Sequence, residues 1–224
     1  MKEKIIHPIA IIKTDFPEKF GIPRQSGRAP SSIAKILLLD KFNDVSAVKR
    51  IEEFSHLWLI FGFSQNPETE NLTVRPPRLG GNEKVGVFAS RSSFRPNGLG
   101  LSVVKLVKVE RGNPIQLIVS GADLLDGSPI YDIKPYIPSS DKIDDAVGGY
   151  AEQFSNHKLI VKISEQLKAL IPSQHFDSVV ECLSDDPRPS YHEDGRIYGM
   201  YYSNLNIKFS VSNDTLTVIE IIEK

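Results

Sequence analysis

Four segments rich in glycine, proline and arginine contain the residues best suited to bind a ligand. They span residues 22–27, 75–81, 91–100 and 125–129, and the last leads into the sequence D-I-K-P-Y at 132–136. Proline limits the conformations of a loop, glycine lets a ligand approach the backbone, and arginine binds carboxylates or phosphates bidentately. Each segment taken singly can be explained as a turn with solvated charges. Four such segments in one small protein indicate an anion-binding site.

Several well-known catalytic signatures are missing from the sequence. The chain has no G-x-G-x-x-G dinucleotide fingerprint, no G-x-x-x-x-G-K-[ST] P-loop, no H-E-x-x-H and no G-x-S-x-G. Its five histidines are scattered without metal-ligand spacing, so we expect no metal site. The single cysteine, Cys182, excludes an intramolecular disulfide. It lies in a predicted amphipathic helix, where we expect a small buried side chain rather than a reactive thiol.

Short strands must position these segments in the first 140 residues. Runs rich in β-branched and aromatic side chains, bounded by Gly, Pro, Asn or Asp, cover residues 5–12, 35–39, 57–63, 85–89, 101–109, 115–119 and 130–134. One helix is predicted near 46–54, where Val48, Ile51 and Phe54 recur at helical spacing. Strands without long intervening helices pair antiparallel. The pattern predicts a mainly β fold, a barrel or sandwich, and disfavours a Rossmann fold.

The sequence changes character after Pro138. Residues 139–149 are polar and glycine-containing, as in a linker. Beyond them the pattern predicts a strand at 158–163, helices at 165–170 and 175–183, and strands at 197–202, 205–211 and 216–222. We therefore predict two domains, 1–140 and 141–224, the second a small α/β domain. A unit of this size buries a marginal core alone, so we expect it to pack on the first domain or on a partner subunit.

The charges are divided unevenly along the chain. The 224 residues have a net charge of −1, but residues 1–110 hold 17 Lys+Arg against 11 Asp+Glu, a net of +6, which leaves −7 for the rest. The most basic window is 71–100, where five basic residues face Glu83 alone. Such asymmetry indicates a polyanionic partner; two solvated surfaces that happen to differ are the alternative.

We expect a cytoplasmic protein. No apolar run approaches the roughly 18 to 20 residues that cross a bilayer. The apolar stretch near the N-terminus is broken by His7 and Pro8 and lacks a small-residue cleavage site, unlike a signal peptide.

The motifs, taken together and in order, resemble one family. It comprises the S-adenosylmethionine-dependent tRNA methyltransferases that act on N6 of threonylcarbamoyladenosine beside the anticodon, at adenosine 37. The resemblance spans nearly the whole chain and rests on F-S-H-L-W (54–58), R-P-P-R-L-G-G (75–81), G-V-F-A-S-R-S (86–92), R-P-N-G-L-G-L-S (95–102), L-D-G-S-P (125–129), D-I-K-P-Y (132–136) and D-P-R-P-S-Y (186–191). The last motif matches the C-terminal extension of the bacterial members. The chain has Gly98, Leu99 and Ser128 where the family commonly has Pro, Ile and Thr.

The resemblance implies a single-sheeted antiparallel β-barrel, a homodimer and S-adenosylmethionine as the cofactor. Carried over by position, the cofactor-binding residues are Arg24, Gln25, Ser26, Gly27, Ser64, Gln65, Arg91, Leu101, Leu125, Asp126, Gly127 and Ser128. Arg, Gln and Ser groups suit the carboxylate and ammonium of the methionine part. Asp126 and Ser128 suit adenine and ribose.

Methyl transfer at N6 also requires a proton to leave the nitrogen. Asp132 is the first candidate proton acceptor, because it follows the cofactor loop and precedes Lys134. The alternative is a structural ion pair of Asp132 with Lys134 or an arginine. His56, between Phe54 and Trp58, fits a hydrogen-bonded core histidine better than a catalytic one.

The tRNA anticodon stem-loop is the expected partner. Candidate phosphate contacts are Arg75, Arg78 and Arg95 in the first domain and Arg188 in the second, and Phe94 and Tyr136 are candidates for stacking on an unpaired base. Two other functions fit the barrel: an S-adenosylmethionine-binding regulatory module without transferase activity, and a small-molecule carrier barrel.

Overall fold

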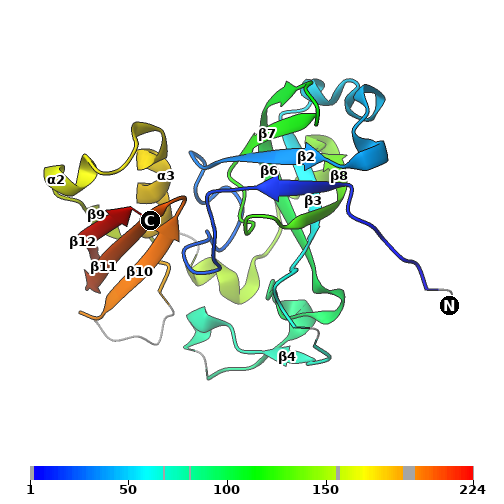
Figure 1. The fold of residues 1–224 in the computed structure, drawn as a ribbon. Helices are drawn as coiled ribbons and strands as arrows, with labels where there is room; N and C mark the ends of the chain where they lie inside the picture. Colours follow the sequence, from blue (N-terminus) through cyan, green and yellow to red (C-terminus); the bar gives the residue numbers. More distant parts are fainter. Residues whose placement is uncertain (1–2, 68, 81, 155–156, 189–194, 224) are drawn as a thin grey trace.

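A closed antiparallel barrel forms the larger part of the molecule (Figure 1). The computed structural model describes residues 3–67, 69–80, 82–154, 157–188 and 195–223. The barrel order is β1-β2-β7-β6-β3-β8, which confirms the predicted mainly β fold and single closed sheet. Its strands are β1 (Ala10–Lys13), β2 (Ile33–Leu38), β3 (His56–Gly62), β6 (Leu99–Glu110), β7 (Gln116–Ser120) and β8 (Pro129–Pro135).

Apolar side chains of period two fill the barrel interior. In β2, Ala34, Ile36 and Leu38 are buried and alternate with more exposed residues. In β3, Leu57 and Leu59 follow the same rule. Successive side chains of a strand point to opposite faces, so one face of the curled sheet becomes the core and the other meets solvent or neighbouring segments.

The antiparallel order brings three long connections to one end of the barrel. Segments 14–32 (β1 to β2), 63–98 (β3 to β6) and 121–128 (β7 to β8) all emerge there, as the registers of the paired strands require. We call this the loop end. The connections at the opposite end are 39–55 and 111–115.

The 63–98 connection carries its own small structure, seen below the barrel in Figure 1. Strands β4 (Thr73–Val74) and β5 (Val85–Gly86) pair antiparallel. Short 3-10 helices follow the proline- and glycine-rich parts of the connection, at Pro77–Leu79, Val87–Ala89 and Pro96–Gly98.

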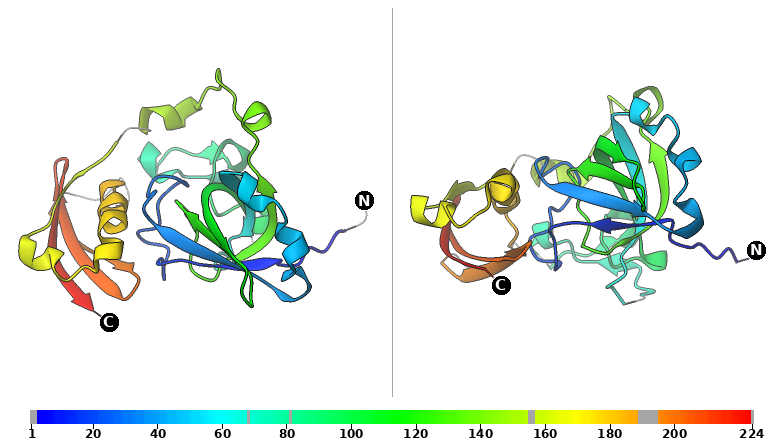
Figure 2. Two further views of the ribbon diagram at one scale, coloured as in Figure 1. Left: turned by 90° about the horizontal axis from the view of Figure 1, so that it is seen from above. Right: turned by 45° about the horizontal axis from the view of Figure 1, so that its top comes forward.

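The C-terminal part is an α/β unit with a sheet of order β10-β11-β12-β9, in which β9 runs parallel to β12. The chain reaches it through helix α1 (Pro138–Asp141) and a 3-10 helix at Gly149–Phe154. Helix α3 lies on the side of this sheet that faces the barrel (Figure 2). The elements are β9 (Ile160–Lys162), α2 (Glu165–Lys168), α3 (Ser173–Ser184), β10 (Ile197–Tyr202), β11 (Leu205–Ser212) and β12 (Thr215–Glu223).

Segment 14–32 of the barrel part completes the core of the C-terminal unit. Phe16 and Ala29 are buried in the same hydrophobic cluster as Leu183 and Phe209. The rings of Phe16 and Tyr202 meet edge to face with centroids 5.6 Å apart. A small unit with a marginal core thus gains apolar burial from the barrel's own connection.

Three sequence-based assignments need correction. The helix expected at 46–54 is two 3-10 helices, Val45–Val48 and Ile51–Glu53, because Arg50 between them has a left-handed backbone (φ 70°) that ends a helical turn. The first strand begins at Ala10 rather than residue 5: Ile5 is 79% exposed, and Pro8 has no N–H to donate to a neighbouring strand. The strand expected at 85–89 has only two residues.

Gly21 lies where the two parts meet, and we predict that Gly21→Ala destabilises their packing. Its φ is 93°, and a Cβ there would lie 2.3 Å from Cγ of the buried Met200. Alanine therefore meets both backbone strain and a steric clash. We expect thermal unfolding to show a loss of about 2–4 kcal/mol.

Gly195→Ala is the matched control. Gly195 has a similar φ of 84°, but nothing lies within 4 Å of its Cβ position, so only the strain applies. Equal losses in the two variants would contradict the importance of the contact with Met200.

Candidate active site

Eleven of the twelve predicted cofactor residues lie on the three connections at the loop end. Residues 24–27 belong to the first connection, Ser64, Gln65 and Arg91 to the second, and residues 125–128 to the third. Leu101 is in β6, close to the same end. The barrel topology thus gathers residues that are far apart in the sequence.

The first two connections touch through predicted cofactor residues. The Arg91 guanidinium donates a 2.5 Å hydrogen bond to Oε1 of Gln25. The first and third connections meet at Gly27, whose N–H donates to the carbonyl of Gly121 at 2.8 Å. A Cβ on Gly121 would lie 3.3 Å from the Gly27 backbone, so this close approach depends on glycine. Arg91 and residues 24–27 therefore form one continuous surface.

Ser64 and Gln65 lie in a turn held by polar contacts. Lys19 donates to the carbonyl of Gln65 at 2.9 Å, and Asn66 donates to the carbonyl of Ser93 at 2.8 Å. The turn is thereby tied to the first connection and to the arginine-rich 91–98 stretch. No hydrogen bond of the Ser64 or Gln65 side chain is recorded in the described structure.

The 125–128 loop uses its polar side chains to hold its own shape. Asp126 accepts hydrogen bonds from the Thr14 N–H at 3.0 Å and from Lys13 Nζ at 3.3 Å. The hydroxyl of buried Ser128 donates to the carbonyl of Leu125 at 2.8 Å. Because these polar side chains already hydrogen-bond within the protein, the backbone groups of the loop are also candidates to bind a ligand.

Asp123 is a polar residue of the same end that the motif analysis missed. Its Oδ1 is buried and has no hydrogen-bond partner among the described residues. Burial raises the pKa of this carboxyl, whereas hydrogen bonds from Ser102 and the Ser26 backbone and the charge of Arg91 act in the opposite direction. The available signal was a lone carboxylate inside the apolar stretch 117–125.

Asp132 lies on the outer surface of the barrel, beside Leu101. It pairs with Ile60 on β3, and Ile60 pairs with Leu101 on β6. Paired residues share a face, and two strand spacings separate Asp132 from Leu101 by roughly 10 Å. Asp132 is half exposed and lies 3.3 Å from Lys134 Nζ. The ion pair that was the alternative reading is present, and it leaves the carboxyl accessible.

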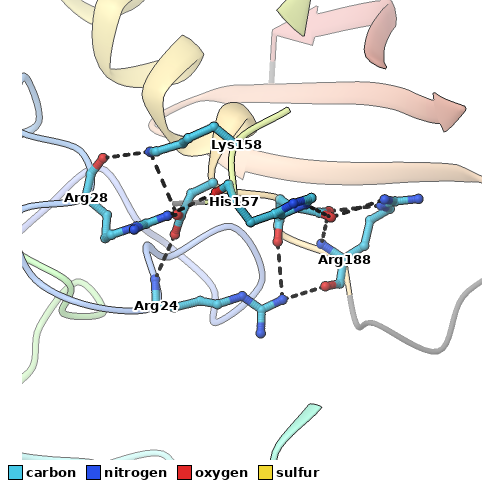
Figure 3. Close-up of polar contacts among 7 residues, drawn as sticks. Arg24, Arg28, His157, Lys158 and Arg188 are labelled. Carbon is cyan, nitrogen blue, oxygen red and sulfur yellow. Dashed lines mark hydrogen bonds and ion pairs between the residues drawn. The ribbon is translucent and has the colours of Figure 1, made fainter. Parts of the chain in front are cut away.

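Arg24 connects the first connection to the C-terminal unit (Figure 3). Its guanidinium donates to the carbonyls of Asp186 at 3.2 Å and Arg188 at 2.5 Å. Its backbone N–H donates to Asp185 at 3.4 Å. The structure thus places this predicted cofactor residue in the junction between the two units.

Asp185, at the end of α3, is the centre of this junction. It is 3% exposed and accepts a 2.5 Å hydrogen bond from Nε of Arg28. Lys158 Nζ lies 3.8 Å away and also donates to the Arg28 carbonyl at 3.4 Å. Nearby, Glu181 accepts hydrogen bonds from the N–H and the hydroxyl of Ser31, both at 2.8 Å. Segment 24–31 is thereby fixed on the C-terminal unit.

The predicted RNA-binding residues fall into three places. Arg75 is exposed on the 63–98 connection, where Phe94 is 49% exposed and Arg95 donates to the Ser90 carbonyl at 3.1 Å. Arg188 forms a bidentate pair with Asp186 in the junction. The backbone of Arg78 lies in the same connection as Arg75, but its side chain and residues 189–191 of the D-P-R-P-S-Y motif lie outside the described part of the chain.

Tyr136 lies at the opposite end of β3 from residue 98, where the arginine-bearing connection ends. Its backbone N–H donates to the carbonyl of His56, at the start of β3. At the other end of the strand, the N–H of Phe63 donates to the carbonyl of Gly98. The seven residues of β3 separate the two sites by roughly 20 Å. The Tyr136 ring instead packs near Trp58, with centroids 5.8 Å apart.

The remaining candidates have structural roles. Cys182 is buried in α3, and burial raises the pKa of its thiol, as expected for an unreactive cysteine. His56 is half-buried and its Nδ1 lies 2.9 Å from the Ser55 hydroxyl. The described residues contain no group of three or more His, Cys, Asp or Glu side chains placed to bind a metal. None of the described helices has the length and apolar character needed to cross a membrane.

Comparison with known proteins agrees with this geometry over both parts of the chain. The model of the tRNA-methyltransferase O N-terminal domain matches residues 11–142, and that of the TrmO C-terminal domain matches residues 156–224. The chain belongs to the tRNA-methyltransferase O family. The two matches coincide with the barrel and with the C-terminal sheet.

Similarity to relatives and to a solved structure covers almost the full length of the chain. A tRNA (adenine(37)-N6)-methyltransferase of Escherichia coli is 37% identical, with 92% of each chain covered. A Pseudomonas aeruginosa protein, RcsF, whose name describes an S-adenosylmethionine-dependent methyltransferase, is 40% identical with 96% of each chain covered. The crystal structure of TrmO from P. aeruginosa superposes with a TM-score of 0.82 at 35% identity, covering 100% of this chain and 99% of that one.

We predict that Asp185→Asn loosens the junction between the two units of this family member. The substitution leaves the largely buried Arg28 guanidinium without its carboxylate, and breaking such a pair costs about 3 kcal/mol. Thermal or chemical unfolding of the full chain measures the loss.

Asp144→Asn is the matched control, because Asp144 pairs with Lys142 on the surface, where their side chains are 81% and 64% exposed. Exposed pairs contribute little to stability, so this variant should unfold like the unmodified chain. The same unfolding midpoint for both variants would show that the junction does not depend on Asp185.

Proposed function

We propose that this chain is an S-adenosylmethionine-dependent methyltransferase that methylates N6 of threonylcarbamoyladenosine at position 37 of tRNA. The observation that carries the proposal is the convergence of the cofactor-motif segments on one end of the barrel, next to an exposed arginine-bearing connection. Family membership and the full-length similarity to a tRNA (adenine(37)-N6)-methyltransferase support it.

The groups at the loop end suit S-adenosylmethionine. Arg91, positioned by Gln25, can bind the methionine carboxylate. The buried Oδ1 of Asp123, which has no hydrogen-bond partner in the described part of the chain, can accept a hydrogen bond from a ligand donor. Backbone groups of residues 125–128 can meet the adenine and ribose. We therefore propose that all twelve cofactor residues contact S-adenosylmethionine. Arg24 would do so while also binding the C-terminal unit at the junction.

The reaction is an in-line displacement in which the sulfonium of the cofactor supplies the methyl group. The largest contribution of the protein is then to hold the N6 nitrogen and the loop end in line. Asp132, accessible on the outer face about two strands from Leu101, is the proposed acceptor for the proton that leaves N6. Lys134 Nζ, 3.3 Å from this carboxylate, would help to orient it.

For the RNA we propose contacts on two sides of the barrel. Arg75, Arg78 and Arg95, together with Phe94, belong to the connection nearest the cofactor residues. Tyr136 lies at the other end of β3 and would meet another part of the anticodon stem-loop. Arg188 follows Pro187, which lines the same pocket as Pro77 of that connection. Because Arg188 already pairs with Asp186, it would contribute to phosphate binding through a shared network.

We further propose domains at 1–140 and 141–224, a homodimer and a cytoplasmic location. The two hydrophobic clusters support the division, with the qualification that Phe16 and Ala29 contribute to the second. The mass in solution, against 25.0 kDa for one chain, decides the oligomeric state.

Cells lacking this chain provide the direct test of activity. Their tRNA should accumulate unmethylated threonylcarbamoyladenosine, measured by nucleoside mass spectrometry. The unmodified gene should restore the methyl group, and Asp132→Asn should restore it slowly or not at all. An unchanged nucleoside profile in the deletion strain would exclude the proposed reaction, and full rescue by Asp132→Asn would exclude its role as proton acceptor.

Arg75→Ala should weaken tRNA binding and reduce its salt dependence. Loss of one phosphate contact makes the log–log slope of affinity against salt less steep by about one unit. Lys208→Ala is the control, because Lys208 pairs with Glu220 on the C-terminal sheet. A slope identical to that of the unmodified chain would show that Arg75 touches no phosphate.

A further inference from the structure

One carboxyl oxygen of Asp123 lacks a hydrogen-bond partner among the described residues. This atom, Oδ1, is buried, although buried carboxyl oxygens are normally hydrogen-bonded. The residue lies three positions after the end of β7, on the third loop-end connection, between Ala122 and Leu124, whose side chains belong to the barrel core. An unpartnered polar atom held in such a rigid position is a place where a ligand donor fits.

The neighbours of Asp123 connect it to three of the proposed cofactor elements. The groups that lower the pKa of this carboxyl, against the effect of burial, include the side chain of Ser102, next to Leu101, and the backbone of Ser26, in the 24–27 segment. Arg91 is close enough to act on the carboxyl electrostatically and is itself held by Gln25. Gln25 belongs to the 24–27 segment, and Gly27 of that segment donates its N–H to the carbonyl of Gly121, two residues before Asp123. The carboxyl and the guanidinium are therefore held on connections that touch at the loop end.

We propose that Asp123 binds the α-ammonium group of the methionine part of S-adenosylmethionine, while Arg91 binds the adjacent α-carboxylate. The two groups of an amino acid have opposite charges, and Asp123 and Arg91 offer the complementary charges on touching connections at the loop end. The assignment rests on the proposed function and adds a cofactor-positioning residue outside the motif set. It also explains why a charged group is kept at the edge of an apolar core, where it has a cost without a ligand.

Asp123→Asn tests the assignment against three ligands: S-adenosylmethionine, S-adenosylhomocysteine and 5′-methylthioadenosine. The first two contain the α-ammonium, and the third lacks the whole amino-acid part. Loss of one charge-assisted hydrogen bond weakens binding about 10- to 100-fold. Calorimetry on the full chain should show this loss for S-adenosylmethionine and S-adenosylhomocysteine, and less than about a 2-fold change for 5′-methylthioadenosine.

The thermal midpoint without ligand provides a second readout. Because burial raises the pKa of the Asp123 carboxyl, the ionised form is disfavoured in the folded state above the ordinary pKa of aspartate. The neutral amide removes this penalty, so the midpoint of Asp123→Asn at neutral pH should equal or exceed that of the unmodified chain. Asp144→Asn, on the exposed linker, should change neither the midpoint nor any of the three affinities.

Three results would overturn the assignment. Equal losses of affinity for all three ligands, with or without a lowered thermal midpoint, would show that Asp123 has only a structural role. A loss for S-adenosylmethionine alone would place the carboxyl at the sulfonium, since S-adenosylhomocysteine keeps the ammonium but has no sulfonium charge. No binding of S-adenosylmethionine by the unmodified chain would reject the proposed function together with this assignment, whereas the first two results reject the assignment alone.

Discussion

Closure of the six-stranded antiparallel barrel is the constraint on which the rest of the structure depends. In an antiparallel barrel every second connection emerges at the same end, so the segments 14–32, 63–98 and 121–128 have to converge. Each is short of regular structure and rich in glycine, proline or arginine. The barrel is therefore the frame that brings these connections together at one end.

The first connection, segment 14–32, is held in place by the C-terminal unit. Phe16 and Ala29 are buried in the C-terminal core, and Arg24, Arg28 and Ser31 are bound by residues at the end of α3 and just beyond it. The C-terminal unit is thus coupled to the same segment that carries residues 24–27. This coupling gives the small unit enough apolar burial to be stable, and it gives the loop fewer conformations.

The charge distribution has a structural explanation as well. The most basic stretch of the first half, residues 71–98 with five Lys+Arg against Glu83, belongs to the 63–98 connection, which lies at the loop end. Part of the acidity of the second half is used internally: Asp185, Asp186 and Glu181 bind arginines and a serine at the junction. A total close to zero therefore combines a basic surface with acidic groups that stabilise the fold, and it does not argue against an RNA partner.

The sequence by itself determined the mainly antiparallel β class and the family, because period-two apolar patterns and ordered motifs are local properties. It placed most barrel strands but set the first one too early and made the one at 85–89 too long. It also determined that Cys182 is a core residue. Local pattern failed at 46–54, where Arg50 interrupts the helical spacing with a left-handed backbone. Only the tertiary structure decided which loops meet, that Arg24 is tied to the C-terminal unit, and that Tyr136 and residue 98 lie at opposite ends of β3. It also decided that Asp123 has a buried oxygen with no hydrogen-bond partner among the described residues. These depend on strand register and on contacts between distant segments, which no local pattern encodes.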